Sequence, residues 1–380
     1  MPTVHILLDY RPALRERTGV GEYAHELAHA LALTAEPGDR LTLFSSSWSD
    51  RVDRSLLQWP ATTVVDRRVP VRVLNWAWHR LQWPPIERLT GDADIAQSLH
   101  PLMVPTRRAK PVVTIHDLDF LQHPERTSAE IRRDYPALVR GHAAAAALIV
   151  TNSRNTADAV QTVLKVARDR LVICRPGLPA WIGTPVERVP PSDGYVLFVG
   201  TLEPRKNLGA LLDAWELLIQ DGGWLPRLRI AGGTRPGSEE WIARLARPPL
   251  RDAVDYVGYI AADARQPLYE GARLLVLPSH HEGFGLPVLE AMALGIPVVA
   301  SNAGALPEVA GDAALLVAPE DRRGLADAIR RVLTSSGLSA DLGRRGVARA
   351  RQFSWTDAAR TLRDAYSRLL SSGRSNAYRH

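Results

Sequence analysis

The chain contains one cysteine, Cys174, among 380 residues, and this scarcity excludes an internal disulfide and a cysteine-rich metal cluster. The sequence also lacks an apolar run of the roughly 20 residues that a membrane-spanning helix needs. Its first residues enter an apolar, strand-like run without a charged leader or a small-residue cleavage site. From these absences we expect a cytoplasmic protein with no transmembrane anchor.

Lysine is the second scarcity. Lys110, Lys165 and Lys206 are the only lysines among 47 basic residues, so arginine carries almost all of the positive charge. This bias is typical of a GC-rich genome. The net charge of +6 favours anionic partners, but we expect none that is a nucleic acid. Because lysine is a compact, strongly hydrated point charge that arginine does not replace, each remaining lysine is a candidate functional residue.

The sequence otherwise has an ordinary globular composition, with 46% hydrophobic and 23% charged residues. At about 150 residues per domain, its length predicts two domains. Strand-like apolar runs alternate with helical stretches in both halves, which predicts an α/β protein with parallel sheets covered on both faces. The expected strands cover residues 4–9, 41–45, 112–116, 147–151, 195–200, 228–231, 253–257, 274–278 and 298–301, and the clearest helices cover residues 22–33, 155–165, 287–294 and 354–370.

A stretch rich in proline and glycine, residues 176–194, separates the two series of strands and is the best candidate for a linker. We therefore expect an N-terminal domain over residues 1–185 and a second domain over residues 192–353. A C-terminal helix is expected within residues 354–380.

Residues 281–290, His-Glu-Gly-Phe-Gly-Leu-Pro-Val-Leu-Glu, are the most informative segment. They follow a buried strand and lead into a helix in which Pro287 suits the first position. The unpaired amides and the positive dipole end of that helix form a site for a phosphate. Glu282 and Glu290 bracket the loop, and because a carboxylate repels a phosphate, we expect both to accept hydroxyl groups. A phosphate site flanked by hydroxyl acceptors predicts a sugar-nucleotide ligand.

This Glu-x7-Glu pattern around Gly-Phe-Gly-Leu-Pro resembles the donor-site motif of the retaining glycosyltransferases of family 4, and the resemblance extends over nearly the whole chain to bacterial mannosyltransferases. It implies an α/β fold of the GT-B type, in which two Rossmann-like domains face each other across a cleft and the C-terminal helix crosses back to the first. It also implies that Phe284, Gly285, Leu286 and Glu290 bind the donor. Glu282 is then a catalytic residue beside the transferred sugar.

A second motif, Gly-Thr-Leu-Glu-Pro-Arg-Lys-Asn over residues 200–207, follows the first expected strand of the second half. Loops at the carboxyl ends of strands bind ligands in α/β sheets. Two adjacent cations there, Arg205 and Lys206, can neutralise a diphosphate as it becomes a leaving group. The resemblance assigns Lys206 to the donor phosphates, as a catalytic residue. The family's earlier arginine is Thr201 here, so Arg205 either takes its place in donor binding or is a solvated residue at a helix start.

Gly19 begins a Gly-x-Gly-x-x-Ala pattern, and Asp39 lies twenty residues beyond it. A dinucleotide-binding loop turns directly out of its strand, whereas residues 10–17 intervene here, and its acidic residue ends the second strand instead of preceding it. We therefore reject an NAD-dependent dehydrogenase. The family resemblance instead assigns Gly19 to a close backbone approach to the donor diphosphate.

Two further residues have alternative roles. His116 ends a strand of the first half and matches a family histidine beside the donor sugar; the alternative is a structural histidine whose hydrogen bonds are satisfied internally. Asp117 is expected to order the turn that follows. Tyr259 ends a strand of the second half, where the resemblance places the nucleobase, so it either stacks on the base or packs in the core.

Residues 67–88 combine tryptophans with arginines. Such a mixture suits a membrane surface, with rings among the headgroups and arginines on anionic lipid. The alternative, which we favour here, is an ordinary helix that packs Trp76 and Trp83 on the sheet.

The sequence therefore predicts a retaining hexosyltransferase that moves a sugar from a nucleoside-diphosphate sugar to a saccharide or lipid-linked hydroxyl acceptor, in surface polysaccharide or glycolipid synthesis. General similarity to mannosyltransferases suggests GDP-mannose as the donor. We expect neither a metal nor a cofactor, because cations of the protein take the place of a metal. A sugar-nucleotide epimerase of the same fold and a non-catalytic scaffold that binds nucleotide sugars are the alternatives.

Overall fold

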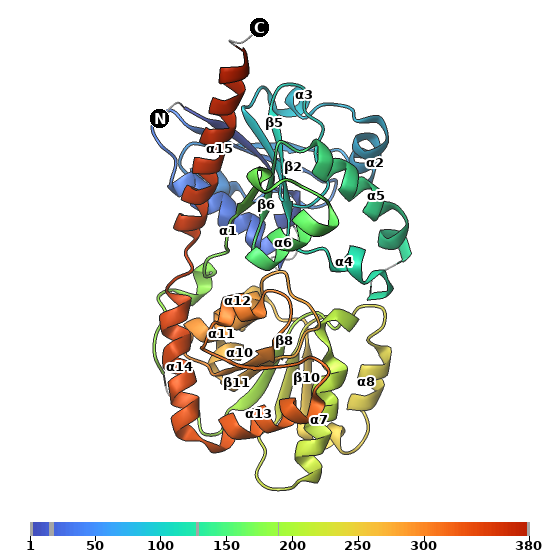
Figure 1. Cartoon of the computed structure of the whole chain (residues 1–380), viewed down its shortest axis with the longest axis vertical. Coiled ribbons are helices and arrows are strands. Elements are labelled where there is room, and N and C mark those ends of the chain that lie inside the picture. The colour runs from blue at the N-terminus through green and yellow to red at the C-terminus, as the bar shows by residue number, and fades with distance from the viewer. Residues whose placement is uncertain (1–2, 15–18, 127–128, 189, 378–380) are drawn as a thin grey trace. The chain divides into compact units, whose positions relative to one another are not determined.

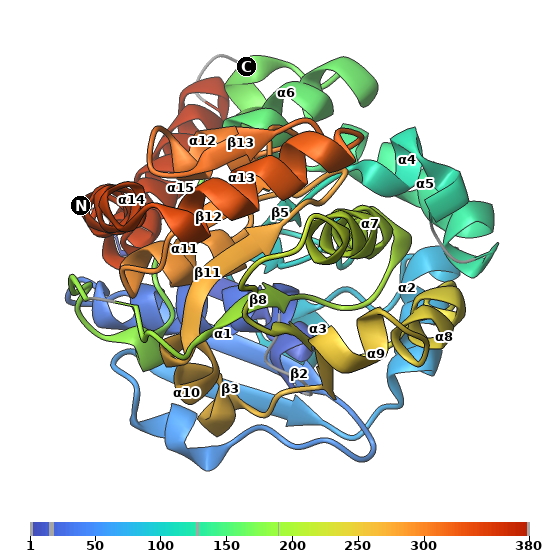
Figure 2. The same ribbon diagram turned by 90° about the horizontal axis from the view of Figure 1, so that it is seen from below.

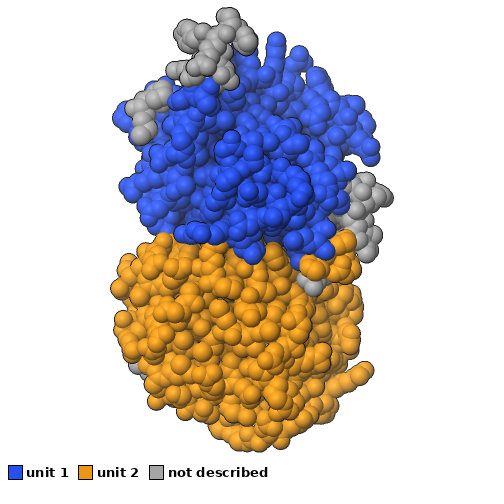
Figure 3. Space-filling model, in the orientation of Figure 1, with its two compact units in different colours: residues 1–122, 129–177, 354–380 blue, residues 123–128, 178–353 orange. Residues whose placement is uncertain are grey.

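The computed structural model describes residues 3–14, 19–126, 129–188 and 190–377. The chain forms two compact units, coloured separately in Figure 3. We call residues 1–122, 129–177 and 354–380 unit 1, and residues 123–128 and 178–353 unit 2. Each unit contains its own parallel sheet and its own buried cores, which confirms two Rossmann-like α/β domains.

Unit 1 is built on a seven-stranded parallel sheet with the order β3-β2-β1-β4-β5-β6-β7 (Figure 1). Its strands are β1 (His5–Asp9), β2 (Arg40–Ser46), β3 (Thr62–Arg67), β4 (Ile95–Ser98), β5 (Lys110–Ile115), β6 (Leu148–Thr151) and β7 (Leu171–Ile173). Its helices are α1 (Val20–Leu33), α2 (Val71–Leu81), α3 (Glu87–Thr90), α4 (Asp119–Gln122), α5 (Ala129–Ala145), α6 (Arg154–Val163) and α15 (Trp355–Ala377), with short 3-10 turns at η1 (Arg11–Ala13), η2 (Arg54–Gln58) and η4 (Arg168–Arg170). Strands buried on both faces read as continuous apolar runs, and for this reason β1 and β6 were predictable.

The last helix, α15, belongs to unit 1 although the chain before it forms unit 2. Its Ala359, Leu362 and Tyr366 are fully buried and share a core with Leu27 and Leu31 of α1. The predicted return of the C-terminal helix to the first domain is therefore confirmed.

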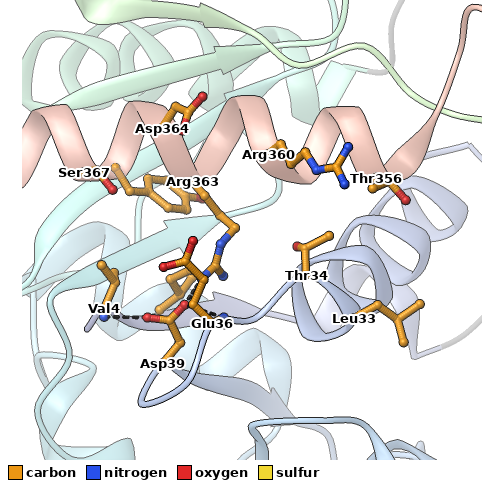
Figure 4. Close-up of a pocket in the computed structure, with 12 residues that line it drawn as sticks. Val4, Leu33, Thr34, Glu36, Asp39, Thr356, Arg360, Arg363, Asp364 and Ser367 are labelled. Carbon is orange, nitrogen blue, oxygen red and sulfur yellow. Dashed lines mark hydrogen bonds and ion pairs between the residues drawn. The ribbon is translucent and has the colours of Figure 1, made fainter. Parts of the chain in front are cut away.

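A cavity of about 510 Å³ lies between α15, the end of α1 and the start of β1 (Figure 4). Arg360 and Arg363 line it from α15. Asp39, on the opposite wall, accepts hydrogen bonds from the backbone N–H of Val4 at 2.8 Å and of Glu36 at 3.0 Å, and it pairs with Arg363. Asp39 thus ties α15 to the loop before β2, a structural role that agrees with the rejection of a dinucleotide site.

Unit 2 is built on a six-stranded parallel sheet with the order β10-β9-β8-β11-β12-β13. Its strands are β8 (Tyr195–Val199), β9 (Leu228–Ala231), β10 (Val254–Gly258), β11 (Ala272–Leu277), β12 (Val298–Ser301) and β13 (Leu315–Val317). Its helices are α7 (Leu208–Gln220), α8 (Glu239–Leu245), α9 (Leu250–Ala253), α10 (Arg265–Glu270), α11 (Leu286–Ala293), α12 (Leu306–Ala310), α13 (Arg322–Thr334) and α14 (Ser336–Ala350), with 3-10 turns at η3 (Pro124–Arg126), η5 (Ala180–Ile182), η6 (Pro204–Lys206) and η7 (Ala262–Ala264). Figure 2 shows α7 and α13 on one side of the central strands and α10 and α11 on the other.

The chain passes from unit 1 to unit 2 after Gly177, earlier than the boundary expected between residues 185 and 192. Ile182 is buried in the core of unit 2, and Leu178 and Trp181 pack against that core. The segment therefore joins unit 2 through its apolar side chains, despite the prolines and glycines that surround them.

The helix predicted around the tryptophans exists as α2, but the side that it buries is not the predicted side with Trp76 and Trp83. Leu74 and Trp78 are buried, whereas Trp76 is 59% exposed and Trp83, beyond the helix end, is 54% exposed. The prediction that Trp76 and Trp83 pack on the sheet is therefore wrong. The buried stripe runs through positions 74 and 78, one helical turn apart, and Arg11 stacks over the ring of Trp78 with its Cζ 4.6 Å from the centroid.

No helix among the described residues has the length and apolarity that crossing a bilayer requires.

Candidate active site

The predicted donor residues of segments 200–207 and 281–290 lie at the point where the strand order of unit 2 changes direction. The central strands β8 and β11 are hydrogen-bonded neighbours, although two other strands separate them in the sequence. The segment with Arg205 and Lys206 follows β8, and the segment with Glu282 follows β11. In open α/β sheets this reversal creates a crevice at the carboxyl ends of the strands, where ligands bind.

A buried ion-pair cluster joins the two segments. Lys206 Nζ donates to Oε1 of Glu282 at 2.7 Å, and Arg205 Nη1 donates to Oε2 of the same carboxylate at 3.1 Å. Ser279 Oγ donates to Glu282 Oε1 at 2.7 Å, and Arg205 also pairs with Glu203 at 2.8 Å. Glu282 is 5% exposed and Lys206 is 9% exposed. The structure thus brings three predicted site residues into direct contact.

The electrostatics of this cluster keep Glu282 charged. Burial alone would raise the pKa of Glu282, but the charges of Lys206 and Arg205, with hydrogen bonds from Lys206 and Ser279, outweigh it and lower the pKa to about 2. In this arrangement the carboxylate lies beside both cations.

Two glycines shape the loop that carries Glu282. Gly304 has a φ of +60°, and a Cβ there would lie 2.6 Å from the backbone N and O of Glu282. Gly285 has a φ of +101°, and a Cβ there would lie 2.5 Å from Cδ2 of Leu306. The neighbouring N–H of Ala305 donates to the carbonyl of Glu282 at 2.9 Å. Close approach of α12 to this loop therefore requires glycine at both positions.

Helix α11 begins at Leu286, one residue before the predicted start, with Gly285 as its N-cap. Pro287 has no N–H group, and the N–H of Val288 donates to the Gly285 carbonyl at 3.0 Å, so the amides left to bind an anion are those of Gly285 and Leu286. Phe284 is only 5% exposed, and its ring packs edge-on against Phe353 with centroids 5.7 Å apart. The ring of Phe284 is thus part of the core of unit 2.

Glu290 lies in α11 and is 7% exposed. The hydroxyl of Tyr269, in α10, donates to its Oε2 at 2.5 Å. Sequence reasoning missed Tyr269, because α10 is a short helix whose residues form no motif. The tyrosine that it selected, Tyr259, follows β10 and is 49% exposed, so its ring is accessible to a stacking partner.

His116 belongs to unit 1, directly after β5. Its Nε2 lies 3.1 Å from the carbonyl oxygen of Leu99, and since a carbonyl only accepts, Nε2 carries the proton. Burial lowers the pKa of His116, so the ring is neutral and Nδ1 is an acceptor. The ring meets that of Tyr23 edge-on at 4.8 Å. Asp117 accepts a hydrogen bond from the N–H of Asp119 at 3.2 Å, which confirms its predicted turn role.

Gly19, the other predicted residue of unit 1, is the exposed N-cap of α1. Its φ is +52°, and a Cβ there would meet no atom within 4 Å. The interval between Asp9, which ends β1, and Val20, which begins α1, agrees with the rejection of a dinucleotide-binding turn.

Asp9 forms a second polar cluster that sequence reasoning missed. Arg11 donates to both oxygens of the fully buried Asp9 carboxylate, at 2.7 and 2.6 Å, and His100 lies 3.1 Å from Oδ2. Arg11 also donates to Asn75 of α2 at 2.8 Å. Burial opposes ionisation, but Arg11 and His100 hold the pKa of Asp9 well below its usual range. The signal in the sequence was an acidic residue at the end of an apolar strand.

In the part of the chain that the structure describes, no group of three or more histidine, cysteine, aspartate or glutamate side chains is arranged to hold a metal ion.

Two family models match the chain. The model described as Glycosyltransferase Family 4 matches residues 17–180, and the model described as Glycosyl transferases group 1 matches residues 193–335. The O-antigen chain mannosyltransferase B of Escherichia coli is 29% identical, over 96% of this chain and 100% of that protein. The serotype-specific mannosyltransferase WbdA of Escherichia coli is 30% identical over 47% of this chain, but the match spans only 22% of its own length.

Solved structures agree on the fold. A sucrose-phosphate synthase from Thermosynechococcus elongatus superposes with a TM-score of 0.76 at 23% identity, over 97% of this chain and 100% of that one. The Anabaena protein HepE in complex with UDP-glucose gives a TM-score of 0.68 at 18% identity, over 97% and 100% of the two chains. The fold and the matched domains define a glycosyltransferase of the GT-B class. Within that class, the chain belongs to the glycosyltransferases of family 4.

Proposed function

We propose that the protein is a retaining hexosyltransferase that moves a sugar from a nucleoside-diphosphate sugar to a hydroxyl acceptor in surface polysaccharide or glycolipid synthesis. The observation that carries the proposal is the pair of cations, Lys206 and Arg205, held by Glu282 where the strand order of unit 2 reverses. The similarity to O-antigen mannosyltransferase B makes GDP-mannose the first candidate donor. The HepE complexes with UDP and UDP-glucose support a nucleotide sugar at this fold.

In this proposal the donor diphosphate replaces Glu282 as the partner of Lys206 and Arg205. The two cations and the amides at the start of α11 then stabilise the charge that develops on the departing phosphate. Glu282, released but still ionised, accepts hydroxyls of the transferred sugar. Protein cations thus perform the task of a metal, and we propose that transfer is independent of metal.

The anomeric configuration is retained because the acceptor oxygen attacks the sugar on the same face from which the phosphate leaves. The bond from the anomeric carbon to the phosphate oxygen breaks, the acceptor oxygen bonds to that carbon, and the proton of the acceptor passes to the phosphate. We assign the proton to the departing phosphate rather than to Glu282, because the phosphate leaves on the face that the acceptor attacks. Glu290 binds the ribose, Tyr259 the base, and His116 and Gly19 make the sugar and diphosphate contacts that family membership implies.

The first test is a thermal-shift screen against GDP, UDP, ADP, dTDP and their sugars, with and without Mg²⁺ and EDTA. Ligand at about 100 times its Kd adds roughly 2.7 kcal/mol, enough to move the midpoint visibly. We expect one donor to stabilise the protein equally with and without metal. The effect should vanish in Lys206→Ala and persist in Lys165→Ala, which removes an exposed lysine of unit 1.

The outcomes separate the alternatives. A strict requirement for a divalent ion contradicts the metal-independent mechanism, and no response to any nucleotide contradicts the donor site. With the selected donor and candidate acceptors, NMR of the product reports the anomeric configuration, and inversion contradicts front-face attack. Conversion of the donor without an acceptor identifies an epimerase instead, and binding without any conversion identifies a scaffold.

We further propose that the exposed side of α2 rests on an anionic membrane surface. Val73, Trp76, Leu81 and Trp83 are all more than half exposed there. Arginines surround them at positions 67, 68, 72, 80 and 88. In residues 67–88 the single acid, Glu87, accepts hydrogen bonds from the backbone of residues 107–109. Exposed rings among cations match the headgroup region of anionic lipid.

Co-sedimentation with vesicles tests this surface. We expect binding to vesicles that contain phosphatidylglycerol, weaker binding at high salt, and loss of binding in Trp76→Ser/Trp83→Ser. The control Trp224→Ser removes a tryptophan of unit 2 that is 64% exposed and should bind as the wild type does. Equal binding by all three proteins would contradict the proposal.

A further inference from the structure

Tyr269 is held firmly against the predicted ribose-binding carboxylate. It is 1% exposed in α10, and its ring packs on Trp181 with centroids 5.5 Å apart. At the other end of the ring, the hydroxyl donates to Oε2 of Glu290 at 2.5 Å. Burial, together with the charge of Glu290, raises the pKa of Tyr269 well above its ordinary value, so the hydroxyl keeps its proton and remains a donor.

We propose that Tyr269 is a positioning residue that fixes the Glu290 carboxylate for the ribose hydroxyls of the donor. The inference rests on the proposed function, in which Glu290 binds ribose. A glutamate side chain has three rotatable bonds, and a carboxylate fixed in advance loses less freedom when the ligand binds. A phenol is suited to this task because it is neutral. The phenol occupies one acceptor position of the carboxylate. It does not neutralise the negative charge, which strengthens the hydrogen bonds from the ribose hydroxyls.

A consequence concerns the class of donor. If Glu290 is held at the ribose, a nucleotide that lacks a ribose hydroxyl loses a hydrogen bond to a buried carboxylate, and this costs affinity. We therefore infer that the enzyme selects ribonucleotide sugars over those of deoxythymidine. The selection should depend on Tyr269 because that residue determines where the carboxylate lies.

The experiment compares Kd by titration calorimetry for the best nucleoside diphosphate and for its 2′-deoxy and 3′-deoxy forms. The wild type should prefer the ribonucleotide over at least one deoxy form by about tenfold or more, as expected for a hydrogen bond to a charged group. In Tyr269→Phe this ratio should fall toward one, through weaker binding of the ribonucleotide with little change for the deoxy form. Tyr195→Phe is the matched control, because it removes a half-buried hydroxyl that donates to the carbonyl of Leu268, in the same helix α10, at 2.5 Å.

A wild-type ratio in Tyr269→Phe overturns the positioning role while the donor site stands. An equal fall in Tyr195→Phe also overturns it, because the effect then comes from the packing of α10. If the wild type binds ribonucleotides without preferring them, the ribose contact of Glu290 fails and the inference fails with it. If the wild type binds no nucleotide, the proposed function itself fails.

A second pair of variants keeps the inference testable if Tyr269→Phe does not fold. Glu290→Ala removes the carboxylate, and Tyr269→Phe/Glu290→Ala removes both partners of the hydrogen bond. If Tyr269 acts through the carboxylate, the two proteins should have the same ribose preference. A further change of the ratio in the double variant overturns the proposal.

Discussion

The charge of Glu282 is predicted to have a large effect on stability. Its pKa falls from an ordinary 4.5 to about 2 on folding, because the pull of Lys206 and Arg205 exceeds the cost of burial. A group with a lowered folded pKa contributes stability above its unfolded pKa, and the contribution disappears as the pH falls through the folded pKa. The expected contribution, on the order of 3 kcal/mol, is therefore complete above about pH 5 and lost between about pH 4.5 and 2.

Urea unfolding of the wild type and of Glu282→Gln at several pH values measures this directly. The wild type should be the more stable protein at pH 6, and the difference should shrink toward pH 2.5. Other titrating groups cancel in the difference between the two proteins. A gap that stays constant with pH would show that the ion pair does not lower the pKa of Glu282.

We predict that substitutions are tolerated less well at Lys206 than at Arg205, because Lys206 is nearly buried and its Nζ lies 2.7 Å from Glu282. An arginine there would carry the charge but not fit the same space. We expect Lys206→Arg to lower kcat by about a hundredfold, the typical cost of one lost contact to a developing charge. The exposed Lys165→Arg should leave kcat unchanged. A kcat within threefold of wild type in Lys206→Arg would contradict direct contact with the leaving group.

At the scale of elements, the fit of α12 against the Glu282 loop depends on Gly304. Alanine at this position would adopt a positive φ and bring its Cβ within 2.6 Å of the Glu282 backbone. We expect Gly304→Ala to lower the free energy of unfolding by about 1–3 kcal/mol and to weaken nucleotide binding as well. The control Gly337→Ala lies in α14 with nothing within 4 Å of the added Cβ, and it should be neutral or stabilising. Equal stability of the two variants would contradict this close approach.

The elements also show which features the sequence could reveal. Strands such as β11 and the start of α11 were predictable, because a buried parallel strand is a continuous apolar run and Gly-x-Pro marks a helix start. The pairing of Lys206 with Glu282 could not be predicted, because they lie 76 positions apart in the sequence and only the adjacency of β8 and β11 brings them together. The strands β3, β4, β7 and β13 were missed; Gln97 and Ser98 look polar in β4, and β7 and β13 have only three residues each. For α2 the periodicity was ambiguous, since several spacings of its tryptophans fit a helix.

On the scale of the whole molecule, α15 completes unit 1. Leu362 is fully buried in the core that α15 shares with α1. Leu362→Ala should lower the free energy of unfolding by about 2–5 kcal/mol. Hydrogen exchange should then rise in α1 and β1 more than in β8 and β11, since each unit has its own core. A uniform rise across both sheets would instead indicate that the two units unfold as one.

The return of α15 has a consequence for biosynthesis. The ribosome synthesises residues 178–353 before α15, the helix that completes the core of unit 1. Unit 2 therefore has its complete sequence while unit 1 still lacks one of its helices. The usual order, in which the N-terminal domain is finished first, is reversed here. Until α15 emerges from the ribosome, the apolar side of α1 that it covers stays exposed. Nascent chains halted before residue 354 should therefore be the ones that chaperones retain.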